Sequence, residues 1–290
     1  MRLFFLLSSL TVLIGNARSK GRLNDKDVKY AKLVEKMHPN TTMVIFLLRH
    51  GQRLPGRFLN GTEHIFSSEL GAYELTKIGK VESTKTGEAL RGFVGSFVSK
   101  DYLQNETEFY SSSASRCEVT LQSLLDGLYS IKPVTSINYT VDDPLLRMYS
   151  VNGCKLNEEV YAPIKNNALP ELMKLYEKNE LILKYMSYKT GWPASIESAV
   201  DLADNLNAMF AHNVSLPDWL KKPELYGYYK KILVEEYLKF NEIHSISCAN
   251  YKPCRNLMSG YLLHKIIGLL GNAAEGVSHP KLVVFVSVCY

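Results

Sequence analysis

The feature that constrains the fold most is an apolar run that ends directly on charged side chains. Residues 42–48 are apolar almost throughout and rich in β-formers, and Arg49 and His50 follow them without a break. A continuous apolar run of this length is typical of a strand buried on both faces, as in a parallel sheet covered by helices. Ligands bind at the carboxyl ends of such strands, so the run predicts a ligand site at Arg49 and His50.

Other segments supply the remaining elements of such a sheet. Strand-like runs recur at residues 108–112 and 281–288, and helical periodicity marks residues 25–37, 75–98 and 116–129. Residues 257–270 are an apolar stretch that His264 and Lys265 interrupt, and we expect a core helix there. Helical patterns dominate residues 145–250, for example at 169–183, 194–210 and 223–240. Together they predict an α/β fold: a three-layer sandwich with a central, mainly parallel sheet and a largely helical inserted cap subdomain.

The N-terminal residues predict export. A basic start, an apolar run at residues 3–14 and small residues at a cleavage point are typical of a signal peptide, here residues 1–19. A membrane anchor is the alternative, but the run is shorter than the about 20 residues that a spanning helix needs, so no stable anchor is expected. Glycosylation is expected because five Asn-x-Ser/Thr sequons are present, at Asn40, Asn60, Asn105, Asn138 and Asn213.

The five cysteines also suit an oxidising compartment. Cys248 and Cys254 would close a short loop, and we expect them to pair. An odd number leaves one thiol over or means that a partner is missing. The formal net charge of +5 suits an anionic substrate. No dense Lys/Arg patch is present, so a nucleic-acid partner is not expected.

The residues at the end of the first strand suit phosphoryl chemistry. Imidazole is a good nucleophile towards phosphorus when its other nitrogen is held by a hydrogen bond. Arg49 and Arg53 flank His50, and a guanidinium can fork onto phosphate oxygens. Gly51 allows the backbone to approach an anion closely, and Pro55 stiffens the exit turn. These residues predict a phosphate-binding site with a nucleophilic histidine.

The pattern Arg49-His50-Gly51-x-Arg53-x-Pro55 after a hydrophobic strand resembles the histidine acid phosphatases, and most closely the secreted arthropod and venom-type members. Further similarity lies in three places: Leu75-Thr76-x-x-Gly79; Tyr110-Ser111-Ser112-x-x-x-Arg116-Cys117; and the insert segments Trp192-Pro193 and Leu216-Pro217-x-Trp219. The resemblance covers most of residues 40–290. It implies a domain over residues 20–290, with a core at about 40–140 and 255–290 and an insert at about 145–250.

The resemblance implies a secreted or lysosomal acid phosphatase that hydrolyses phosphate monoesters, on small molecules or proteins, through a phosphohistidine intermediate. His50 would be the nucleophile, and Arg49, Arg53 and Arg116 would bind the substrate phosphate. The family uses no metal and no cofactor, and its members often form homodimers. A phosphoglycerate-mutase-like enzyme shares Arg-His-Gly but is disfavoured by the signal peptide, by Arg53-x-Pro55 and by the helical insert.

The sequence departs from the family pattern after the last strand. The family places there a second histidine followed by an acid that protonates the leaving alcohol; aligning Ser287 puts Cys289 and Tyr290 at those positions. Three interpretations follow: a truncated product, a short form with weak activity, or a pseudophosphatase that binds phosphorylated ligands. Without the proton donor, any activity is expected to favour aryl over alkyl phosphates.

Overall fold

A parallel sheet forms the middle layer of the fold. The computed structural model describes residues 37–38, 40–62, 71–129, 137–147 and 154–288. The sheet that these residues form has the strand order β1 (Val44–Arg49), β4 (Leu282–Ser287), β2 (Thr107–Ser111) and β3 (Thr140–Val141). Every neighbouring pair is parallel, with Arg49 opposite Ser287 and Ser111 opposite Val286. The carboxyl ends of β1, β4 and β2 therefore meet at one edge.

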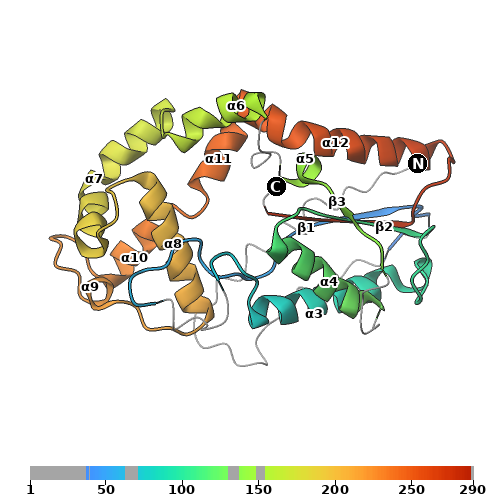
Figure 1. The fold of residues 1–290 in the computed structure, drawn as a ribbon, viewed down its shortest axis with the longest axis horizontal. Coiled ribbons are helices and arrows are strands. Elements are labelled where there is room, and N and C mark those ends of the chain that lie inside the picture. The colour runs from blue at the N-terminus through green and yellow to red at the C-terminus, as the bar shows by residue number, and fades with distance from the viewer. Residues whose placement is uncertain (1–36, 39, 63–70, 130–136, 148–153, 289–290) are drawn as a thin grey trace.

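Helices cover both faces of this sheet, which confirms the predicted three-layer α/β sandwich (Figure 1). One face carries α3 (Lys77–Val94), which continues into the 3-10 helix η1 (Gly95–Phe97), and α4 (Ser115–Tyr129). The other face carries α5 (Asp143–Leu146) and α12 (Lys252–Ala274). All six residues of β4 are buried, as a strand between two helical layers requires.

A second apolar core lies among the helices between α5 and α12. These helices are α6 (Lys155–Lys165), α7 (Pro170–Thr190), α8 (Ile196–Ala211), α9 (Asp218–Lys221), α10 (Lys230–Leu238) and α11 (Ile243–Asn250). Their buried side chains form one cluster, which Leu54 and Leu59 of the segment after β1 join. In Figure 1 most of these helices lie to one side of the sheet rather than over its faces. The loop after His50 is thus anchored in the helical part.

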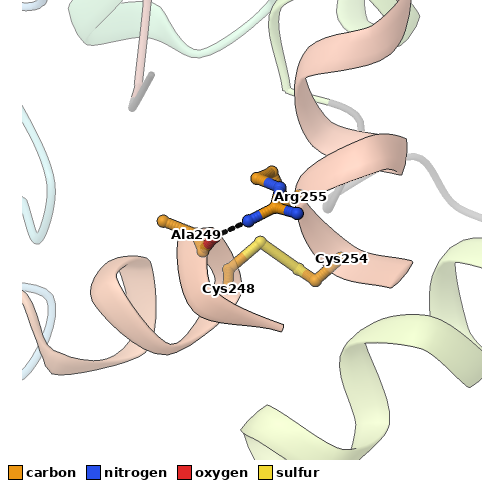
Figure 2. The surroundings of a disulfide bond; sticks show 4 residues. All are labelled: Cys248, Ala249, Cys254 and Arg255. Atoms are coloured by element: carbon orange, nitrogen blue, oxygen red, sulfur yellow. Dashed lines mark hydrogen bonds between the residues drawn. A yellow bond between two sulfur atoms is a disulfide. The ribbon is translucent and has the colours of Figure 1, made fainter. Parts of the chain in front are cut away.

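A disulfide joins Cys248 of α11 to Cys254 of α12, as expected (Figure 2). Beside it, Arg255 donates a hydrogen bond to the carbonyl oxygen of Ala249 at 3.2 Å. Among the described residues, Cys117 is buried and Cys154 is partly exposed, and both are free thiols. Cys289 lies outside the described residues.

The structure shifts several predicted helix boundaries and adds one strand. The helix predicted at residues 223–240 begins only at Lys230, because residues 222–229 turn and Gly227 has φ +81°. The short strand β3 contains no apolar run from which it could be predicted. The predicted signal peptide at residues 1–19 lies outside the described residues, as does the helix at residues 25–37 except for its last residue.

Candidate active site

His50 is the first residue after β1 and is 6% exposed. Its backbone N–H donates to the carbonyl oxygen of Ser287 at 3.0 Å, which continues the β1–β4 ladder by one bond. The Nδ1 atom lies 2.8 Å from the carbonyl oxygen of Gly51. A carbonyl can only accept, so Nδ1 carries the proton and Nε2 carries the lone pair. Nε2 is buried and has no hydrogen-bond partner among the described residues.

The pKa of His50 is lowered from the usual 6.5 to about 2, mainly by burial and next by the charge of Arg49. The charges of Arg116 and Arg53 act in the same direction, while the bond to Gly51 opposes them. Because charge repulsion decays with distance, the three guanidiniums lie close enough to the imidazole to lower its pKa. The ring is therefore neutral, and Nε2 is unprotonated, in mildly acidic solution.

The loop that carries His50 is held by both helices of one sheet face. The backbone N–H of Gly51 donates to Thr120 Oγ1 of α4 at 3.0 Å. A β-carbon at Gly51 would lie 2.7 Å from the carbonyl oxygen of Gly79 in α3, so this contact requires glycine. Thr76 caps α3 by accepting from the N–H of Gly79, and its own N–H donates to the carbonyl oxygen of Gln52 at 3.0 Å.

Arg49 and Arg116 approach the site from different elements. Arg49 ends β1, is exposed, and donates through Nε to the carbonyl oxygen of Val288 at 3.0 Å. Arg116 lies in the first turn of α4, directly after the carboxyl end of β2. The start of this helix also directs backbone N–H groups towards the same sheet edge, which favours an anion. The charges of Arg49, Arg53 and Arg116 all act on His50, and their predicted role in phosphate binding stays a prediction.

Arg53 is held by a carboxylate that the sequence did not indicate. Its Nη1 lies 2.6 Å from Asp204 Oδ2 of α8 and 2.8 Å from the carbonyl oxygen of Leu54. Its Nε is buried and has no hydrogen-bond partner among the described residues. Asp204 also accepts from the N–H of Gly56 at 3.3 Å. A helix of the second core therefore fixes a guanidinium at the sheet edge.

A second carboxylate of α8 lies close by. Asp201 is 4.0 Å from Arg57. Burial raises the pKa of Asp201 to about 6, while the charge of Arg57 opposes that rise. In the parts of the chain that the structure describes, no group of three or more His, Cys, Asp and Glu side chains is arranged to hold a metal ion. Beside the imidazole and the guanidiniums, the site thus contains the carboxylate of Asp204, which pairs with Arg53.

Sequence comparisons find acid phosphatases. Rat and bovine lysosomal acid phosphatases are 23% and 24% identical over 258 residues, which is 83% of this chain and 59% of each relative. An acid phosphatase homologue from Caenorhabditis elegans is 24% identical over 242 residues, which is 79% of this chain and 54% of that protein. No family model matches the chain. The chain thus spans between 54% and 59% of the length of these curated relatives.

Structure comparisons find phytases. A phytase of Klebsiella sp ASR1 superposes with a TM-score of 0.57 at 15% identity, over 85% of this chain and 70% of that structure. The multiple inositol polyphosphate phosphatase of Bifidobacterium longum, solved with inositol hexasulfate, superposes with a TM-score of 0.58 at 12% identity. The superposition covers 88% of this chain and 75% of that structure. At these identities the likeness shows a shared fold. It agrees with the sheet and helical layers described above.

Proposed function

We propose that this chain, whose sequence relatives and structural neighbours support the histidine acid phosphatase family, hydrolyses phosphate monoesters through a phosphohistidine intermediate. One observation carries the proposal: the Nε2 lone pair of His50 is buried, lacks a hydrogen-bond partner among the described residues, and faces three guanidinium charges. A buried nitrogen without a hydrogen-bond partner, next to several positive charges, costs free energy when no ligand is bound. A phosphate dianion would neutralise the guanidiniums and occupy the space at Nε2.

In the first step the phosphate of the substrate binds Arg49, Arg53 and Arg116. His50 Nε2 then attacks phosphorus and the bond from phosphorus to the leaving oxygen breaks. That oxygen takes a proton from water and leaves as the alcohol or phenol. The imidazole gains positive charge as the N–P bond forms. The Gly51 carbonyl oxygen, which already accepts from Nδ1 at 2.8 Å, stabilises this charge without moving.

In the second step water attacks the phosphohistidine. The N–P bond breaks, its electron pair returns to Nε2, and inorganic phosphate leaves. The guanidiniums hold the charge of the transferred group in both steps, which is the positioning and electrostatic logic of phosphoryl transfer. Each charge-assisted hydrogen bond contributes about 1.5–3 kcal/mol. Arg53 suits this role because its buried Nε has no hydrogen-bond partner among the described residues while Asp204 holds its Nη1.

We further propose that the protein is a glycoprotein that is secreted or lysosomal and acts on small-molecule or protein phosphomonoesters. Two of its relatives are lysosomal acid phosphatases. The asparagine of each of the five sequons is exposed, as glycosylation requires. Among the described residues, no helix is long and apolar enough to cross a membrane. The homodimer, the signal peptide and the boundaries of core and insert stay predictions.

The test is turnover of p-nitrophenyl phosphate at pH 5 by the purified chain and by His50→Ala. We expect the wild-type chain to form a covalent phosphoenzyme and His50→Ala to lose about 10³-fold or more in kcat, as removal of a nucleophile does. His264→Ala, which replaces an exposed histidine of α12, is the matched control and should keep wild-type activity.

Two results separate the alternatives. Wild-type turnover that survives in His50→Ala would disprove the phosphohistidine route. A chain that binds phosphate through Arg53 and Arg116 yet turns over no aryl phosphate is the pseudophosphatase, which keeps the pocket without the reaction.

A further inference from the structure

Tyr73 lies next to two of the proposed phosphate-binding arginines. The guanidinium carbon of Arg53 is 5.3 Å from the centroid of the Tyr73 ring, and that of Arg116 is 5.4 Å from it. Both distances are within the range of cation–π attraction, about 6 Å. The guanidiniums of Arg53 and Arg116, from different parts of the chain, thus both make cation–π contacts with the Tyr73 ring.

The backbone around Tyr73 holds the ring in this place. Tyr73 has φ +65°, a left-handed conformation that a bulky residue rarely adopts. Its N–H donates to the carbonyl oxygen of Pro55 at 3.2 Å, and the N–H of Leu54 donates to the carbonyl oxygen of Glu74 at 2.9 Å. A β-carbon at Gly56 would lie 2.1 Å from Tyr73 Cζ, so the ring occupies the space that any other residue at 56 would need.

A tyrosine by itself disfavours this positive φ, and the contacts with Pro55, Gly56 and the two arginines maintain it. Such residues are found preferentially at binding and catalytic sites. Tyr73 is also 49% exposed, so much of its surface is open although two arginines and Gly56 contact it. The open surface is therefore available to a ligand.

The position of the ring determines what it can touch. Both guanidiniums lie within cation–π distance of the ring, so an anion that they hold together lies in the neighbourhood of the ring. The group attached to that phosphate is then the next part of the ligand to reach the ring. Tyrosine rings pack best against flat, apolar or aromatic groups, in offset-stacked or edge-to-face arrangements.

We propose that Tyr73 is a specificity-determining residue that selects phosphorylated ligands with an aromatic group next to the phosphate. This inference rests on the proposed phosphate site, but not on turnover. Its mechanism is a direct contact between the ring and the aromatic group, with Arg53 and Arg116 holding the anion.

The experiment compares phenylphosphonate with methylphosphonate, which share the anion and differ in the attached group. Calorimetry on the purified chain gives both dissociation constants, and inorganic phosphate serves as the reference ligand. We expect wild-type protein to bind phenylphosphonate about fivefold or more tightly than methylphosphonate, a preference of the size that one aromatic contact provides.

Variants of Tyr73 separate the ring from the backbone. Tyr73→Phe keeps the ring and should keep the preference. Tyr73→Leu keeps apolar bulk without the ring, and Tyr73→Gly removes the side chain where glycine adopts positive φ freely. Both should bring the ratio of the two constants to about one, with the methylphosphonate constant changed by less than about threefold. Tyr226→Leu, at a fully exposed tyrosine, is the control and should leave the ratio unchanged.

Three other outcomes are informative. A preference that persists in Tyr73→Gly overturns the inference. Equal weakening of both ligands in Tyr73→Gly also overturns it, and shows that the ring only positions the arginines. Failure of wild-type protein to bind phosphonates and inorganic phosphate alike overturns the proposed phosphate site together with this inference.

Discussion

His50 Nδ1 and the carbonyl oxygen of Gly51 are 2.8 Å apart, and this contact decides which nitrogen of the ring carries the lone pair. Because the carbonyl accepts, the proton is on Nδ1 and the lone pair is on Nε2. The partner belongs to the adjacent residue, so the tautomer is fixed by the same turn that brings His50 to the end of β1. The imidazole is oriented before any substrate arrives.

The buried neutral state of His50 predicts a stability that falls in acid. The pKa of His50 is lowered to about 2 in the folded chain, whereas the unfolded chain keeps the usual 6.5. Below the usual value the unfolded chain binds a proton that the folded chain does not, so stability is lost as the pH falls from about 6.5 towards 2. At pH 4.5 the loss is about 2–3 kcal/mol, taken from 1.36 kcal/mol per pKa unit.

His50→Asn removes this penalty. Denaturant unfolding at pH 7.5 and pH 4.5 should show a smaller loss of free energy of unfolding in His50→Asn than in wild type. His264→Asn, at an exposed histidine, should behave as wild type. An identical pH dependence in His50→Asn and wild type would contradict the lowered pKa.

The ion pair between Arg53 and Asp204 predicts measurable coupling between the sheet edge and α8. Both side chains are largely buried, with 16% and 27% exposed, so water screens the pair only partly. A double-mutant cycle with Arg53→Ala and Asp204→Ala should give a coupling energy of about 1–2 kcal/mol in unfolding experiments.

The matched control is the exposed pair Lys221–Asp218, in which 98% of the aspartate side chain is accessible. Its coupling energy should be zero within error because solvent screens it. Equal coupling in the two pairs would mean that Arg53 is not fixed by Asp204.

Two glycines of α3 should respond in opposite ways to the same substitution. A β-carbon at Gly87 would lie 1.9 Å from the carbonyl oxygen of Leu124 in α4, whereas one at Gly92 would meet nothing within 4 Å. Gly87→Ala should destabilise the protein by about 1–3 kcal/mol because the helices must separate. Gly92→Ala should stabilise it by about 0.5–1 kcal/mol, since alanine loses less entropy in a helix. Thermal unfolding measures both, and stabilisation by Gly87→Ala would rule out the close helix contact.

The disulfide should contribute to stability without contributing to phosphate binding. Cys248 and Cys254 are separated by 6 residues, and closing so short a loop stabilises a protein by about 2 kcal/mol in the chain-entropy model. The double variant Cys248→Ser/Cys254→Ser should lower the free energy of unfolding by about that amount. Its affinity for inorganic phosphate should stay at the wild-type value, and a large loss of affinity would place the disulfide in the binding machinery.

Features that depend on neighbours in sequence could be predicted from the sequence. The apolar run before Arg49 specified a buried strand, because periodicity and β-propensity are local properties. The position of His50 at the carboxyl edge followed from the end of that run. Cys248 and Cys254 lie close enough in sequence for proximity alone to favour their pairing. In contrast, the turn at Gly227 and the short strand β3 left too weak a local pattern to predict.

Contacts between residues far apart in sequence were decided only by the tertiary structure. Asp204 reaches Arg53 across 151 positions, and no spacing in the sequence relates a carboxylate of α8 to the loop after β1. The contact of the Tyr73 ring with Arg53 and Arg116 depends on a positive φ that its residue type disfavours. Local sequence determined which groups reach the sheet edge, because a strand end is a local property. Packing of the helical part determined how they are held, because that depends on the whole fold.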